Sequence, residues 1–140
     1  MKKIIAVVLA LALSVSSFGI GVYAEDLDTY ENEDITVYYL YTGDIASYIS
    51  ISSKTATCTS YVDGDTGVTK IAVTQTLQKK DGNSWRTVTS WSKTYYDDSC
   101  NYVNTYSSLN GGTYRTKTVA KVYRGTAYET ITNYSSSSSC

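Results

Sequence analysis

The sequence predicts an all-β protein in which about seven short strands form two antiparallel sheets packed face to face. Three observations support this prediction. Stretches rich in Thr, Tyr, Val and Ile recur along the chain, and polar and apolar residues alternate within them at a period of two. Groups containing Gly, Asp or Asn separate these stretches as turns do. Apolar residues nowhere recur at the three- and four-residue spacing of a helix.

The first 24 residues are expected to be a secretory signal peptide. Lys2 and Lys3 make a positively charged start, and residues 4–13 form an apolar run that is too short for a comfortable membrane span. Val22-Tyr23-Ala24 fits the site that a signal peptidase reads, so cleavage is expected after Ala24. The remaining residues, 25–140, suffice for one domain and contain no further membrane span. The protein is expected to be secreted, either extracellular or at the cell surface.

Polar segments are expected at both ends of the mature chain. Residues 25–47 form an acidic N-terminal arm in this reading, either a solvated leader or a docking tail. The stretch 35–41 could add an edge strand to the arm, and Gly43-Asp44 is expected to break it. Residues 135–140 are expected to be a flexible Ser-rich tail.

Residues 48–134 are expected to form the sandwich itself. Asp63-Gly64-Asp65-Thr66-Gly67 and Arg124-Gly125-Thr126 are turn sequences, and Asp81-Gly82 is a strong hairpin signal. The expected strands cover residues 47–52, 54–62, 69–80, 85–95, 100–106, 113–123 and 127–134. The expected core residues are Ile49, Ile51, Ala56, Cys58, Ile71, Val73, Leu77, Val103, Leu109, Tyr114, Ala120, Val122 and Ile131, together with one or both Trp.

Leu109, Gly112 and Tyr114 have the spacing of the tyrosine corner found in immunoglobulin-like sandwiches. In that motif a Leu fills the core, a Gly makes the turn, and the Tyr hydroxyl satisfies a backbone group a few residues upstream. The alternative is an ordinary hairpin with a surface Tyr. In the strand that follows, Arg115, Lys117 and Lys121 have the parity opposite to Tyr114, which predicts a solvated face or a guarded sheet edge.

The chain has three cysteines, so at least one cannot pair within it. Cys58 and Cys100 are the candidates for a disulfide, because an immunoglobulin-like layout places them on neighbouring antiparallel strands. The alternative is that Cys58 is a buried free thiol. Cys140 follows the Ser-rich run and is the candidate for a free thiol that could join two chains into a dimer.

The sequence offers little chemistry for catalysis. It contains no His, which removes the commonest general base, the usual catalytic triads and most zinc sites. Asp63 and Asp65 alternate with Gly as in a calcium loop, but Thr74 stands where that loop needs a Glu, so a plain turn is expected. The 12 basic and 13 acidic residues give no support for nucleic-acid binding. We therefore expect no enzyme, no metal and no cofactor.

Aromatic residues are in excess, with 15 Tyr and 2 Trp against 1 Phe. A core of this size cannot bury every Tyr ring with a satisfied hydroxyl, so some rings must be exposed. Rings on a rigid sheet can form a platform for a sugar or a protein, although a solvent-facing Tyr needs no ligand to explain it. The candidate binding residues are Trp85, Trp91, Tyr95 and Tyr96, with both Trp expected on one face of the fourth strand.

Four features stand together in residues 48–134: Ile71-Ala72-Val73-Thr74-Gln75-Thr76-Leu77-Gln78-Lys79-Lys80, then Trp85 and Trp91, then Leu109-x-x-Gly112-x-Tyr114-Arg115, and then Glu129-Thr130. Through these features the segment resembles a group of small secreted proteins of Gram-positive bacteria that carry one immunoglobulin-like domain of unknown function. The resemblance implies the fold and a location outside the cell, and it carries no activity and no catalytic residues.

Three functional hypotheses are consistent with the sequence. The first is a secreted, non-enzymatic binding module whose partner is a cell-wall glycan or an extracellular protein. The second is a structural protein of the cell surface that self-assembles through exposed strand edges or through Cys140. The third is a small secreted toxin or inhibitor.

Overall fold

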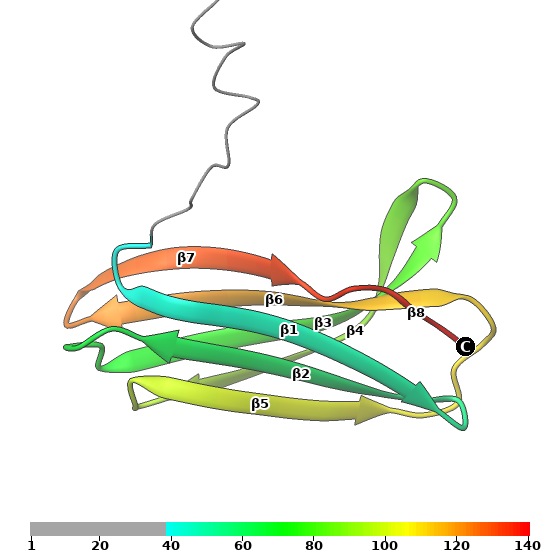
Figure 1. The fold of residues 1–140 in the computed structure, drawn as a ribbon, viewed down its shortest axis with the longest axis horizontal. Helices are drawn as coiled ribbons and strands as arrows, with labels where there is room; N and C mark the ends of the chain where they lie inside the picture. The colour runs from blue at the N-terminus through cyan, green and yellow to red at the C-terminus, as the bar shows by residue number, and fades with distance from the viewer. Residues whose placement is uncertain (1–38) are drawn as a thin grey trace, which may run out of the picture. The chain divides into compact units, whose positions relative to one another are not determined.

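The computed structural model describes residues 39–140, which form two antiparallel β-sheets packed face to face and contain no helix (Figure 1). The smaller sheet has the order β1-β2-β5, and the larger has the order β4-β3-β6-β7, with β8 added to β6. No helix within residues 39–140 could therefore cross a membrane. The predicted signal peptide and most of the predicted arm lie outside the described residues. The strands are β1 Thr42–Ser52, β2 Thr55–Gly64, β3 Lys70–Asp81, β4 Ser84–Tyr95, β5 Ser99–Tyr106, β6 Thr113–Arg124, β7 Ala127–Tyr134 and β8 Ser138–Ser139.

The two antiparallel sheets confirm the predicted β-sandwich. The Asp81-Gly82 turn, with Gly82 at a φ of 61°, joins β3 and β4 as a hairpin. The fourth strand therefore extends the sheet of the third, whereas in a constant-type immunoglobulin domain it joins the sheet of the first two. The end of this hairpin turns away from the sandwich (Figure 1).

The predicted tyrosine corner is confirmed between β5 and β6. Tyr114 is buried, and its hydroxyl donates to the carbonyl of Asn110 at 2.6 Å. Leu109 is also buried, and its N–H donates to the carbonyl of Lys54 at 3.0 Å. These two bonds tie the crossover between the sheets to the β1–β2 turn and orient the start of β6.

The core consists of two apolar clusters separated by buried polar side chains. One cluster surrounds Ile71, and the other surrounds Leu77 and Tyr114. Gln75 lies between Ile71 and Leu77 along β3 and is fully buried. The sequence-based core omits this polar layer, and it includes Val103, which is 49% exposed. Val103 lies opposite Thr59 in the register of β5 with β2, and this places it on the outer face of the smaller sheet.

The predicted boundary between arm and sandwich at residues 47 and 48 is wrong, because β1 begins at Thr42. The register shifts between Thr42 and Asp44, so Gly43 and Asp44 form a bulge through which the strand continues. The carboxylate of Glu129 on β7 secures this start by accepting hydrogen bonds from Leu40, Tyr41 and Thr42.

The prediction of a flexible C-terminal tail is also wrong. Ser138 and Ser139 pair with Tyr114 and Thr113 of β6 as strand β8. The Ser135 hydroxyl accepts a hydrogen bond from the buried N–H of Thr116 at 2.8 Å, and the Ser135 N–H donates to the Thr116 carbonyl at 2.9 Å. The tail continues the edge beside β6 after β7 has ended, and backbone pairing requires no large side chains.

Of the two alternatives for Cys58, the structure has the buried free thiol and not the disulfide, because Cys58 and Cys100 are both free and buried. Cys58 lies opposite Asn104 and Cys100 lies opposite Val62, so the two Cys are offset by four residues along neighbouring strands. Four residues correspond to about 13 Å along a strand, well beyond the reach of a disulfide. Cys140 is free and exposed, as predicted.

Candidate functional site

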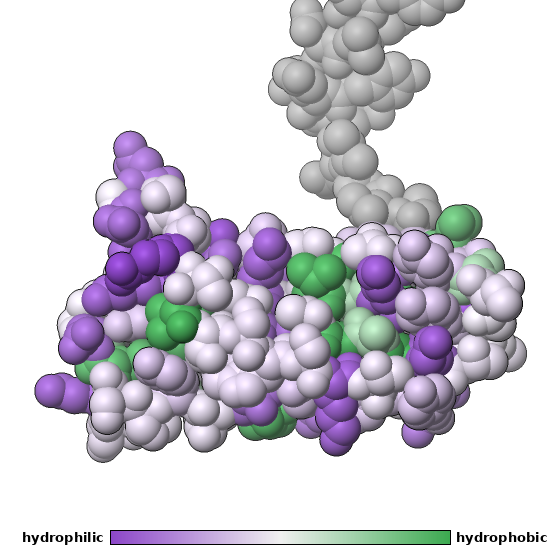
Figure 2. Space-filling model, turned by 180° about the vertical axis from the view of Figure 1, so that it is seen from behind, coloured by the Kyte–Doolittle hydropathy of each residue, from purple (hydrophilic) through white to green (hydrophobic). Residues whose placement is uncertain are grey.

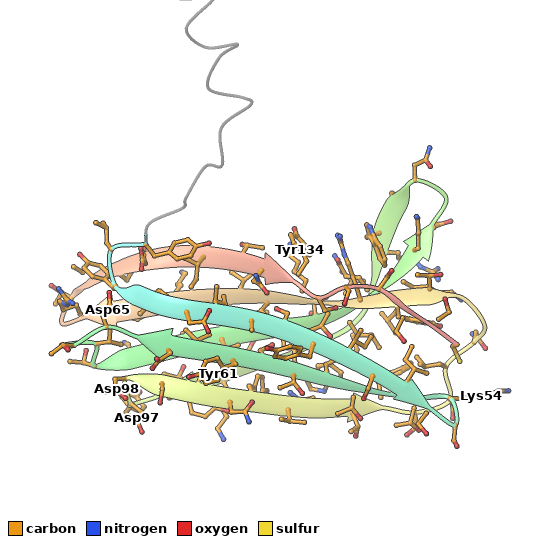
Figure 3. The ribbon with its side chains drawn as sticks, viewed as in Figure 1. Lys54, Tyr61, Asp65, Asp97, Asp98 and Tyr134 are labelled. Carbon is orange, nitrogen blue, oxygen red and sulfur yellow. The ribbon has the colours of Figure 1, made fainter. Side chains whose placement is uncertain are left out.

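The outer face of the larger sheet carries an arginine in contact with two aromatic rings. The Cζ atom of Arg115 lies 4.1 Å from the centroid of the Trp85 ring and 4.1 Å from that of the Tyr134 ring. The Arg115 Nε donates to the side-chain oxygen of Gln78 at 2.8 Å. Figure 3 shows Tyr134 at the end of β7, beside the β3–β4 hairpin. We call Trp85, Arg115, Tyr134 and Gln78 the arginine cluster.

A β-bulge in β4 creates this cluster. Leu77 pairs with Thr89 and Gln78 pairs with Thr87, which leaves Val88 as an extra residue in β4. One extra residue reverses the alternation of faces, so the side chains before the bulge and those after it no longer follow one period of two. Trp85 therefore joins the outer face with Arg115, although it lies six residues from the inward-facing Trp91.

The prediction that both Trp share a face is thus wrong, and the four predicted binding residues do not form one platform. Trp91 lies opposite Gln75 and packs against the Leu77 cluster of the core. Tyr95 packs against the other core cluster, with its ring 6.1 Å from that of Tyr102. Tyr96 lies beyond the end of β4 and is 84% exposed. Only Trp85 belongs to the arginine cluster.

The remainder of the outer face continues the pattern of cations against rings. The Lys70 ammonium lies 4.1 Å from the Tyr123 ring centroid, and the Lys121 ammonium lies 5.3 Å from that of Tyr128. The two Tyr rings lie 5.1 Å apart. Such contacts hold cationic groups against flat apolar surfaces while they remain open to water.

Charge divides the two outer faces of the sandwich. The register places no Asp or Glu among the outward-facing positions of β3, β4, β6 and β7. The outward-facing cations of these strands are Lys70, Lys80, Arg115, Lys117 and Lys121. Figure 2, seen from behind the view of Figure 1, shows separate hydrophilic groups on a mostly pale surface and no large apolar patch.

The opposite face, on β1, β2 and β5, is neutral to acidic. Its outward positions include Tyr48, Tyr61 and Val103, and Asp44 pairs with Asp63 at one end. The negative charge of the Asp63 carboxylate makes the largest contribution to the raised pKa of Tyr61. Asp65, Asp97 and Asp98 gather at the same end (Figure 3). An anionic partner would therefore approach the larger sheet rather than the smaller one.

Sequence reasoning missed three members of the arginine cluster. The sequence predicts a solvated face or a guarded sheet edge for Arg115, but β6 lies between β3 and β7 and is not an edge. The period of two correctly predicts that Arg115 lies on the solvent-facing side of β6. Its contact with Tyr134 depends on the β6–β7 register, which the sequence does not reveal. No group of three or more His, Cys, Asp or Glu in the described part of the chain could hold a metal ion.

These features define an immunoglobulin-like β-sandwich with an open cationic and aromatic sheet face. No protein-family model, curated protein or solved structure matches the chain.

Proposed function

We propose that the protein is a secreted, non-enzymatic binding module that takes an extracellular glycan on the outer face of its larger sheet. The observation that carries the proposal is the contact of Arg115 with both Trp85 and Tyr134. The rings supply flat surfaces on which a sugar ring can stack, and the guanidinium supplies hydrogen bonds to sugar oxygens.

Preorganisation supports this role for Arg115. Its Nε is held by Gln78, while its terminal nitrogens have no acceptor within residues 39–140. A guanidinium already fixed by two rings and one hydrogen bond loses little further conformational freedom when it binds. Rows of Thr and Ser lie beside it on the same face, including the hydrogen-bonded pairs Thr74–Ser92 and Thr76–Ser90.

The proposal is tested by retention of the purified protein on insoluble cell wall and on common polysaccharides. We expect Tyr134→Ala and Arg115→Gln to lower retention about tenfold or more, since each removes stacking or charge-assisted hydrogen bonding. Tyr48→Ala is the matched control, because Tyr48 is an exposed Tyr on the opposite face. Equal losses in Tyr134→Ala and Tyr48→Ala, or no retention of the unmodified protein, would overturn the proposal.

The second candidate is a self-assembling surface protein, and the exposed thiol of Cys140 favours it. The N–H of Cys140 donates to the Gly112 carbonyl at 2.8 Å, so the residue is anchored beside the tyrosine corner. An anchored, exposed thiol is suited to a disulfide between two copies of the chain in an oxidising environment.

A further inference from the structure

We propose that a second site, separate from the arginine cluster, binds a small oxyanion: a phosphate, sulfate or carboxylate group. The site is a pocket of about 90 Å³ between the end of the β3–β4 hairpin and the corner that joins β5 to β6. Anion binding at this second site goes beyond the proposed glycan binding and does not depend on it. Its polar lining consists of Lys79, Arg86, Tyr106, Ser108, Asn110 and Tyr114.

Two cations face each other across the hairpin without a carboxylate in the pocket. Lys79 lies directly opposite Arg86 in the register of β3 with β4. Like charges at directly opposed positions destabilise a β-ladder. The neighbouring pair, Lys80 and Trp85, lies on the other face of the hairpin. An anion between Lys79 and Arg86 would turn their repulsion into two favourable contacts.

The position of Lys79 is set by the tyrosine corner. Gly112 has a φ of 152°, and a Cβ atom there would lie only 2.7 Å from the Cε atom of Lys79. The missing side chain lets Lys79 cross the corner, where its ammonium lies 5.6 Å from the centroid of the Tyr114 ring. The contacts with Gly112 and the Tyr114 ring therefore hold the Lys79 ammonium at the pocket.

Ser108 contributes a hydroxyl to the lining of the pocket from an unusual backbone conformation. Its φ is 62°, in the left-handed region that disfavours residues other than Gly. Backbone strain of this kind is concentrated at functional sites, where surrounding contacts maintain it. Here it keeps a hydroxyl donor in the lining, which Gly at the same position would not supply.

The size of the pocket suits a single anionic group. Its volume of about 90 Å³ leaves room for one tetrahedral or planar oxyanion. The lining offers the Lys79 ammonium, the Arg86 guanidinium, the hydroxyls of Tyr106 and Ser108 and the Asn110 side-chain amide, all of which can donate to oxygen, whereas the Tyr114 hydroxyl already donates to the Asn110 carbonyl. A free ion and an anionic substituent on a polymer share this chemistry.

The test is a titration of the purified protein with sodium phosphate, sodium sulfate and glucuronate at constant ionic strength, followed by backbone amide NMR shifts. We expect saturable shifts at residues 108–112. Arg86→Gln and Lys79→Gln should weaken binding about tenfold or more, whereas Lys80→Gln should change it less than twofold. Lys80→Gln removes the same charge from the same hairpin on its other face. Shifts that do not saturate, or equal weakening in all three variants, would overturn the site.

Ser108→Gly separates the role of the hydroxyl from folding. This variant relieves the strained φ, so its thermal midpoint should rise while its affinity for phosphate falls. Unchanged affinity would remove Ser108 from the site. Retention of Arg86→Gln on polysaccharide then identifies the source of the anion: loss assigns it to a polymer substituent, and full retention assigns it to a free ion. If Tyr134→Ala and Arg115→Gln were retained on polysaccharide as well as the unmodified protein, glycan binding at the arginine cluster would be overturned and the anion site would not.

Discussion

The side-chain amide of Gln75 donates a hydrogen bond to the hydroxyl of Ser60 at 2.8 Å, across the interior between the two sheets. Gln75 also donates to the Tyr102 carbonyl at 3.0 Å and accepts from the Asn104 amide at 2.9 Å. Thr118 extends the chain of bonds, with its hydroxyl 2.6 Å from that of Ser60. A satisfied network of this kind fixes which strands face each other, because any slip leaves buried polar groups unpaired.

Replacement of Gln75 by Leu should therefore destabilise the protein although it makes the core more apolar. The Asn104 amide would lose the acceptor that Gln75 supplies, and Ser60 would lose its donor. We expect a loss of about 2–4 kcal/mol in the free energy of unfolding, measured by urea titration. A change below about 1 kcal/mol would mean that the network contributes little beyond the space it fills.

Tyr114→Phe isolates the hydrogen bond of the tyrosine corner. The ring remains, but the Asn110 carbonyl loses the hydroxyl donor at 2.6 Å. We expect a loss of about 1–2 kcal/mol in urea unfolding. Equal stability of the variant and the unmodified protein would show that the corner is held by ring packing alone.

The Glu129 carboxylate should make the start of β1 sensitive to acid. Burial by itself would raise the pKa of Glu129, but hydrogen bonds from the backbone N–H groups of Tyr41 and Leu40 and from Thr42 outweigh burial and lower this pKa. A lowered pKa adds stability that is present above the unfolded pKa of about 4.3 and is lost as the pH falls through the folded value.

Hydrogen exchange of the Tyr41 and Leu40 amides should consequently accelerate below about pH 4. Glu129→Gln should show the faster exchange already at pH 7, after correction for the intrinsic pH dependence. Asp81→Asn, which removes one negative charge at the exposed β3–β4 turn, serves as the charge-matched control. Identical exchange in Glu129→Gln and the unmodified protein would contradict the role of the carboxylate.

Thiol reactivity should distinguish Cys140 from the two buried cysteines. Burial raises the pKa of the Cys58 thiol, and a hydrogen bond with Thr116 offsets part of this rise. Burial also raises the pKa of Cys100 to about 11. We expect one fast-reacting thiol per native chain and three in denaturant, because the thiolate is the reactive form. Cys140→Ser should abolish the fast phase, whereas its persistence would place a reactive thiol on β2 or β5.

The exposed thiol also predicts a covalent dimer under oxidising conditions. Non-reducing electrophoresis should show a dimer band that reductant and Cys140→Ser both remove. A monomer in the reduced and the non-reduced lanes would exclude this form of self-assembly.

The fold class, the turns and most strands could be predicted from the amino-acid sequence, because these depend on local chemistry. Three local signals illustrate this: Gly82 in its turn, the period of two in β6, and the Leu109–Gly112–Tyr114 spacing. Each signal involves residues that are close together in the sequence. The faces on which distant side chains meet depend on strand register, which is set by tertiary packing. The Val88 bulge reverses Trp85, the β6–β7 register brings Tyr134 to Arg115, and backbone pairing orders the Ser-rich tail. A one-residue shift exchanges the faces of a strand, so side-chain alternation alone could not assemble the candidate sites.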